Sequence, residues 1–127
     1  MYQNKRLIKH PENAEKVKAK YILEIANGPV SAEADVILKK KGVIVVPDIL
    51  ANAGGVVVSY FEWAQNKMGN ILDEEYLRQK LEKMMTASFN KVYELFKQGN
   101  GIDLRKAAYI IAIKRILAAE KARGNLA

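Results

Sequence analysis

Residues 21–46 constrain the fold of this chain most, because their pattern predicts a strand, a helix and a second strand in close succession. Residues 21–25 are mostly apolar and rich in strand-forming types. Residues 43–46 are β-branched throughout and apolar on both faces, which is typical of a buried parallel strand. The chain is therefore expected to contain a parallel sheet.

The helix expected between these strands carries signals at both ends. Ser31 suits the N-cap position, and two acidic residues follow it in the first turn. Lysines at 39–41 fall in the last turn, and Gly42 suits the position just after the helix. Strand–helix–strand units are right-handed in nearly all proteins. The predicted fold class is α/β, with a partial Rossmann-like parallel sheet over about residues 21–46 and helices after it.

Two loops, residues 26–29 and 47–52, follow the two predicted strands. Because the strands are parallel, their carboxyl ends lie at the same edge of the sheet. Ligands of open α/β sheets bind outside this edge. The sequence therefore predicts a ligand site formed by these two loops.

The segment from residue 46 to residue 63 combines glycines and isolated polar residues with a strongly apolar stretch. Three consecutive valines at 56–58 favour a strand, whereas a good N-cap at Asn52 favours a helix. Local propensity leaves both structures open. Gly54 and Gly55 are explained equally well by a close helix–strand crossing or by room for a ligand beside Asn52 and Ser59.

Two long helices are predicted in the rest of the chain. Asp73 and Asp103 suit their N-caps, and glycines follow each predicted helix. Apolar residues recur at helical spacing and are expected to form the core. They are Leu77, Leu81, Met84, Met85, Phe89, Val92 and Phe96 in the first helix, and Ala107, Ile110, Ile111, Ile113, Ile116 and Leu117 in the second.

Composition excludes several classes of protein. The 127 residues include no cysteine, so the chain has no disulfide framework or thiolate metal site, as is usual in a reducing cytoplasm. No apolar run approaches the roughly 20 residues that span a bilayer. The net charge of +7 has two interpretations, a solvated basic surface or a nucleic-acid site. We favour the first, because no zinc-finger spacing or arginine-rich recognition helix is present.

Few catalytic patterns can be assembled from this sequence. The only G-x-G, at residues 99–101, follows a predicted helix and lacks the third glycine of a dinucleotide fingerprint. His10, the only histidine, lies in a charged stretch and is interpreted as a surface residue. Asp48 is interpreted as a loop or cap residue rather than a catalytic carboxylate. We assign no catalytic residue and no metal ligand.

Several motifs of this chain resemble the signature of the glutamate dehydrogenase family (Glu/Leu/Phe/Val dehydrogenases). They are Ala26-Asn27-Gly28-Pro29, Glu33-Ala34-Asp35, Pro47-Asp48-Ile49-Leu50-Ala51-Asn52-Ala53-Gly54-Gly55-Val56 and Val58-Ser59-Tyr60-Phe61-Glu62-Trp63. The residues Arg105, Ala107, Ala108 and Tyr109 resemble the family's C-terminal helix. The similarity covers about residues 13–123. It favours the helix over the strand for residues 52–67.

The resemblance implies roles for individual residues. Ala26 and Asn27 would approach the nicotinamide ribose of NAD or NADP, and Asn52 would lie between the nicotinamide and the α-carbon of the substrate. Val56 and Ser59 would contact the side-chain end of glutamate. The family reaction passes a hydride between the α-carbon of glutamate and the cofactor, releasing 2-oxoglutarate and ammonia. The residue pattern predicts a polar, partly helical lead-in over residues 1–20. The resemblance implies that residues 21–127 form the second half of a dinucleotide-binding domain plus closing helices, as a single domain.

The family's catalytic lysine and aspartate and its glycine-rich phosphate loop have no counterpart in this sequence. Two hypotheses follow for a cytoplasmic protein. The chain is the C-terminal segment of a glutamate dehydrogenase and is inactive alone, or it is a stand-alone, non-enzymatic relative. In both cases the open strand edges favour self-association or pairing with the missing N-terminal part of the enzyme.

Overall fold

The computed structural model describes residues 10–125, so residues 1–9 of the predicted polar lead-in lie outside the described part. Residue contacts divide the chain into two compact units. Unit 1 spans Met1–Asn52 and unit 2 spans Ala53–Ala127. We describe each unit by itself.

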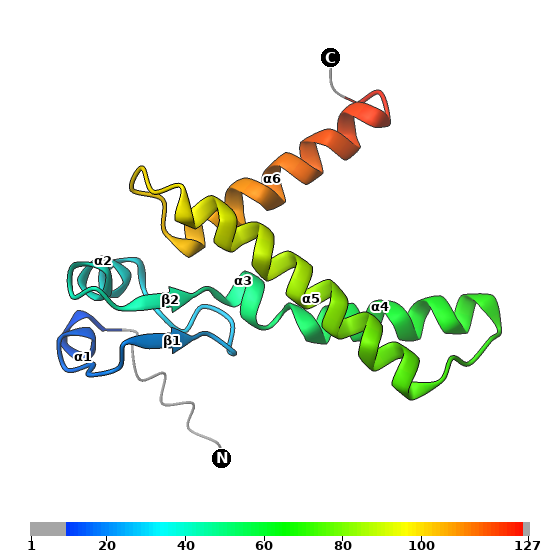
Figure 1. Cartoon of the computed structure of the whole chain (residues 1–127), viewed down its shortest axis with the longest axis horizontal. Helices are drawn as coiled ribbons and strands as arrows, with labels where there is room; N and C mark the ends of the chain where they lie inside the picture. The colour runs from blue at the N-terminus through cyan, green and yellow to red at the C-terminus, as the bar shows by residue number, and fades with distance from the viewer. Residues whose placement is uncertain (1–9, 126–127) are drawn as a thin grey trace. The chain divides into compact units, whose positions relative to one another are not determined.

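Unit 1 contains the predicted parallel sheet. Its elements in chain order are α1 (Pro11–Glu15), β1 (Tyr21–Leu23), α2 (Ala32–Lys40), β2 (Ile44–Val46) and α3 (Asp48–Ala51) (Figure 1). β1 and β2 pair in parallel, with Tyr21 opposite Ile44 and Leu23 opposite Val46. The predicted strand–helix–strand order is confirmed, although β1 ends two residues earlier than expected.

The predicted caps of α2 are confirmed. The Ser31 hydroxyl accepts a hydrogen bond from the Ala34 backbone N–H at 3.2 Å. After the helix, Gly42 adopts a φ of +72°, in the left-handed region that favours glycine. These local signals fix the length of α2 and so determine where β2 begins.

The core of unit 1 lies between the helices and one face of the sheet. Ala14, Ala34 and Leu38 are completely buried. Partly buried apolar residues pack around them, namely Val17, Ile22, Val30, Ile37, Val43 and Val45. The expected complete burial of the second strand is wrong, because Ile44, Val45 and Val46 are all only partly buried. Ile22 and Val45 are the sheet residues that pack against this core among the described residues of unit 1.

The side chain of Lys41 links α1 to the end of α2. Its Nζ atom donates to the carbonyl oxygens of Ala14 (3.2 Å) and Val17 (2.9 Å), and also to that of Glu15. The carbonyls of Ala14 and Glu15 belong to the last turn of α1, and that of Val17 follows the helix. Carbonyls at a helix C-terminus need partners from outside the helix. The Lys41 side chain therefore caps α1, while the Lys41 backbone forms the C-cap of α2.

Unit 2 consists of helices α4 (Ala53–Met68), α5 (Glu74–Lys97) and α6 (Leu104–Ala122). The helix favoured for residues 52–67 is confirmed. Asp73 accepts from the N–H groups of Glu75 and Tyr76, and Asp103 accepts from that of Lys106, as the predicted N-caps require. α5 contacts both α4 and α6 (Figure 1).

Much of the expected helical core lies on the surface instead. Val92 and Ala107 are buried, but Met84 and Phe89 are about two-fifths exposed. Ile113, Ile116 and Leu117 are also exposed, at 46–63%. The described part of α6 meets α5 only near its N-terminal end, where Leu104, Ala107 and Ala108 are buried. An apolar surface of this extent is typical of an interaction face.

None of the helices in residues 10–125 is long and apolar enough to cross a membrane.

Candidate functional site

The two loops predicted to form a ligand site lie together at the carboxyl edge of the sheet in unit 1. Leu23 and Val46 pair at the ends of their strands, so both strands stop at the same level. The Glu24 N–H then donates to the Val46 carbonyl at 3.1 Å, which extends the ladder by one bond. Residues 26–29 and 47–52 follow directly, so the predicted placement of these loops is confirmed.

Hydrogen bonds in which Asp48 takes part join the two loops. One carboxylate oxygen of Asp48 accepts from the Gly28 N–H at 2.8 Å, and the other accepts from the Ile49 N–H at 2.8 Å. The Asp48 N–H donates to the Glu24 carboxylate at 2.7 Å. The interpretation of Asp48 as a loop or cap residue therefore agrees with its position in the first turn of α3.

The side chains of Asn27 and Asn52 meet across this edge. The Asn52 Nδ2 donates to the Asn27 Oδ1 at 2.5 Å, although 25 residues separate them in the sequence. Asn52 is the C-cap of α3, and its side-chain amide donates to Asn27. Ala26 and Asn27 are exposed. The structure thus brings together three of the five predicted site residues.

The other two predicted site residues, Val56 and Ser59, lie on α4 in unit 2. Three positions separate them, so they share one helix face. Val56 is 69% exposed, and the Ser59 hydroxyl donates to the Gly55 carbonyl at 3.1 Å. Both side chains are accessible on the surface of α4.

The two glycines at the start of α4 are not required by packing within this chain. A Cβ atom built at Gly54 would meet only Leu81 Cδ1, at an ordinary 3.9 Å, and one at Gly55 would meet nothing within 4 Å. Glycine in a helix interior is less stable than alanine by about 0.5–1 kcal/mol. Packing within unit 2 therefore does not account for these two glycines.

We predict that Gly54→Ala and Gly55→Ala each leave the fold intact and raise the free energy of unfolding of unit 2 by up to about 1 kcal/mol, because alanine restricts the unfolded chain. Urea denaturation followed by the far-ultraviolet circular dichroism of the helices measures this change. Gly99→Ala is the matched control. Its φ of +73° makes alanine unfavourable, so its free energy of unfolding should fall. A loss of stability in both α4 variants would show that packing requires these glycines.

Glu24 belongs to the site but was not singled out from the sequence. It is 1% exposed, and it is the only charged residue in the predicted first strand. A buried charge is costly unless hydrogen bonds stabilise it. A lone acidic residue at the end of an apolar strand was the signal that could have indicated it.

Within residues 10–125, no group of three or more histidine, cysteine, aspartate or glutamate side chains could hold a metal ion. The pKa of Glu33 is lowered by its own backbone N–H and then by the Ser31 hydroxyl at the start of α2. The pKa of Lys97 is raised by its hydrogen bond to Glu94 on α5. The Glu33 shift thus arises within the start of α2, and the Lys97 shift arises within α5.

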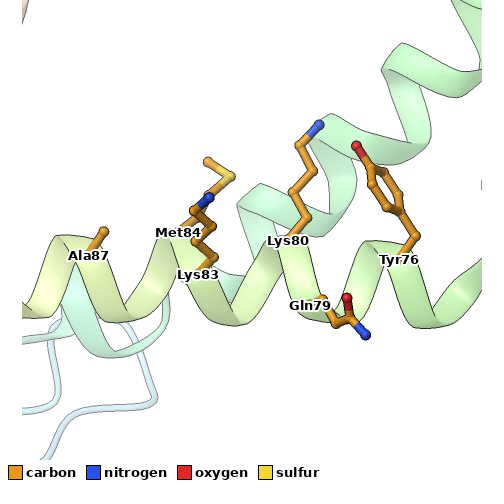
Figure 2. A pocket seen from close by; sticks show the side chains of 6 residues that line it. All are labelled: Tyr76, Gln79, Lys80, Lys83, Met84 and Ala87. Carbon is orange, nitrogen blue, oxygen red and sulfur yellow. The ribbon is translucent and has the colours of Figure 1, made fainter.

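A hollow of about 530 Å³ runs along the surface of α5. All six residues that line it come from this one helix, so it is an open groove (Figure 2). The Lys80 Nζ lies 5.1 Å from the centroid of the Phe61 ring and 5.8 Å from that of Tyr76. Its ammonium is thus already placed over aromatic rings. We do not assign a ligand to this groove.

Comparison with known proteins identifies related sequences over nearly the whole chain. The family model described as Glutamate/Leucine/Phenylalanine/Valine dehydrogenase matches residues 7–124. The chain is 53% identical over 115 residues to a glutamate dehydrogenase of Thermotoga maritima, covering 91% of this chain and 27% of the relative. It is 52% identical to an NADP-specific glutamate dehydrogenase of Saccharolobus shibatae (90% and 27%). It is 50% identical to an NAD-specific glutamate dehydrogenase of Staphylococcus aureus (89% and 27%).

Solved structures agree with the sequence matches. Glutamate dehydrogenase from Peptoniphilus asaccharolyticus superimposes with a TM-score of 0.83 at 40% identity, covering 92% of this chain and 29% of that one. The hetero-hexameric glutamate dehydrogenase from Thermus thermophilus, in a leucine-bound form, gives 0.84 at 32% identity, covering 93% and 28%. The chain spans about a quarter of the length of the curated relatives it matches.

Proposed function

We propose that this chain, which belongs to the glutamate/leucine/phenylalanine/valine dehydrogenase family, contributes part of the cofactor and substrate site of a glutamate dehydrogenase. The observation that carries the proposal is the joined pair of loops at the carboxyl edge of the sheet. There, Asn27 and Asn52 present side-chain amides next to each other. This is the edge at which open α/β sheets bind dinucleotides.

The residues of unit 1 would bind the cofactor. Ala26 and Asn27 would approach the nicotinamide ribose, and Asn52 would lie between the nicotinamide ring and the α-carbon of the substrate. The exposure of Ala26 and Asn27 and the amide contact of Asn27 with Asn52 support this role. One relative is named NADP-specific and another NAD-specific, so we propose one of these two dinucleotides as the cofactor.

The start of α4 would bind the side chain of glutamate. The Ser59 hydroxyl would turn from the Gly55 carbonyl to donate to the substrate carboxylate, and Val56 would contact the substrate's methylene groups. The accessible Val56 and Ser59 side chains and the space beside Gly55 support this role. The proposed reaction transfers a hydride from the α-carbon of glutamate to the nicotinamide, and hydrolysis of the resulting imine gives 2-oxoglutarate and ammonia.

We predict that the chain alone does not oxidise glutamate. Both Asp48 carboxylate oxygens accept backbone N–H groups, so this acid serves the fold rather than proton transfer. Loss of a general acid or base alone lowers a rate by about 10²–10⁴-fold. The test is the appearance of reduced nicotinamide absorbance when purified chain is mixed with glutamate and either NAD or NADP, and the expected result is no change.

An Asn52→Leu variant serves as the control for a contaminating enzyme. Turnover that is present in the wild type and absent from this variant would belong to the chain and would refute the prediction. Turnover that is equal in both preparations would come from a contaminant.

The alternative function is that of a stand-alone, non-enzymatic protein that acts through self-association or a partner chain. The exposed apolar residues of β1, Tyr21 at 70% and Leu23 at 60%, favour an associated state. One relative is described as hetero-hexameric, which fits assembly with another chain. We propose a cytoplasmic location for either form. The chain contains no cysteine, as is usual for proteins of a reducing cytoplasm.

A further inference from the structure

Asp48 makes hydrogen bonds to both ends of the loop that carries Asn27. At the start of this loop, the Glu24 carboxylate accepts from the Asp48 N–H at 2.7 Å. At its end, the Gly28 N–H donates to the Asp48 carboxylate at 2.8 Å. Residues 24 and 28 are thereby held by one residue of the second loop, with Asn27 between them.

Asp48 also holds the residue that carries the second amide. The Asn52 N–H donates to the Asp48 carbonyl at 3.0 Å, as the single turn of α3 requires. A single residue is therefore bonded to both segments that present the Asn27 and Asn52 side chains. The two amides meet at 2.5 Å.

The burial of Glu24 is explained by the same arrangement. Its side chain is 1% exposed, although an apolar residue at this position would fill the space without the cost of desolvating a carboxylate. Its bond to the Asp48 N–H satisfies a backbone donor in the partly buried turn that follows β2. Glu24 thus stabilises the position of Asp48 from beneath the loop.

We propose that Asp48 is a positioning residue that sets the spacing of the Asn27 and Asn52 amides for a nicotinamide cofactor, and that Glu24 supports it. The spacing function follows from the geometry of the loops. Its use in cofactor binding rests on the proposed function above.

The experiment uses heteronuclear NMR of the full chain, first without ligand. In the wild type we expect a nuclear Overhauser cross-peak between the Asn52 side-chain amide protons and the Asn27 side chain. Asp48→Ala removes both oxygens that accept from Gly28 and Ile49, so we expect loss of this cross-peak with the α2 and β2 signals unchanged. A cross-peak that persists in Asp48→Ala would overturn the proposal.

Two variants of Glu24 separate positioning from general stability, should Asp48→Ala fail to fold. Glu24→Gln keeps an oxygen that can accept from the Asp48 N–H, so the cross-peak should remain. Glu24→Leu fills the same space without an acceptor, so the cross-peak should be lost. The same response from both Glu24 variants would overturn the proposal. As a control, Glu62→Gln, at an exposed site on α4, should change neither the cross-peak nor the fold.

A titration with NAD⁺ then tests the link to the cofactor. In the wild type we expect NAD⁺ to shift the Asn27 and Asn52 amide signals. An apparent affinity for NAD⁺ at least about tenfold weaker in Asp48→Ala, the effect of one lost hydrogen bond, would support the link. Absence of shifts in the wild type would count against cofactor binding by this chain. In that case the ligand-free spectra still decide the positioning role.

Discussion

Leu38→Ala is expected to lower the free energy of unfolding of unit 1 by about 2–5 kcal/mol. Leu38 is completely buried, and its neighbours Ala14 and Ala34 are too small to fill the cavity that the substitution leaves. Whole domains have only about 5–15 kcal/mol of stability, and unit 1 has a small core. Hydrogen exchange of the β1 and β2 amides, read by mass spectrometry, measures the loss.

Val36→Ala is the matched control for this prediction. Val36 lies on the same helix but is 54% exposed, so its truncation should change the free energy of unfolding by no more than about 0.5 kcal/mol. Equal effects of the two substitutions would contradict the core described for unit 1.

Lys41→Met is expected to release α1 from the rest of unit 1, at a cost of about 1–3 kcal/mol for hydrogen bonds from a charged donor. The Nζ atom of Lys41 donates to the carbonyls of Ala14, Glu15 and Val17. A helix as short as α1, five residues, is not stable by itself in water. Methionine keeps the aliphatic stem but removes every donor.

Amide hydrogen exchange of residues 11–17 measures this effect, and protection there should fall while that of α2 changes little. The neighbouring Lys40 provides the control, because Lys40→Met removes the same charge from the exposed end of α2. Equal loss of α1 protection in both variants would mean that the charge, and not the three bonds, stabilises α1.

Local signals in the sequence were sufficient to place most helices. Ser31, Asp73 and Asp103 accept backbone N–H groups at helix starts, as their positions predicted. At 52–67 the same reasoning left strand and helix open, because the valines at 56–58 favour a strand and Asn52 favours a helix start. Family resemblance, rather than propensity, supported the helix found there.

Burial could not be predicted in the same way. Helical periodicity identified an apolar face on the segment of α6 that carries Ile113 and Ile116, and these residues are more than half exposed. The periodicity of apolar residues shows that a helix has an apolar face, but it does not show that the same chain supplies a surface to cover that face.

The candidate site was predictable in outline only. The rule for parallel strands placed the loops of Asn27 and Asn52 at one edge, where their amides do meet. The bonds that fix them, from Asp48 to Glu24 and Gly28, join residues 20 to 24 positions apart. No local pattern in a single sequence indicates such pairs.

The most direct test of the proposed function is a chimera of the Thermotoga maritima glutamate dehydrogenase in which the aligned segment of 115 residues is replaced by that of this chain. We predict that the purified, assembled chimera reduces NAD or NADP when glutamate is added, and that Asn52→Leu within it abolishes this activity. A chimera that folds and assembles like its parent but does not oxidise glutamate would contradict the proposal that this chain supplies a working part of the site.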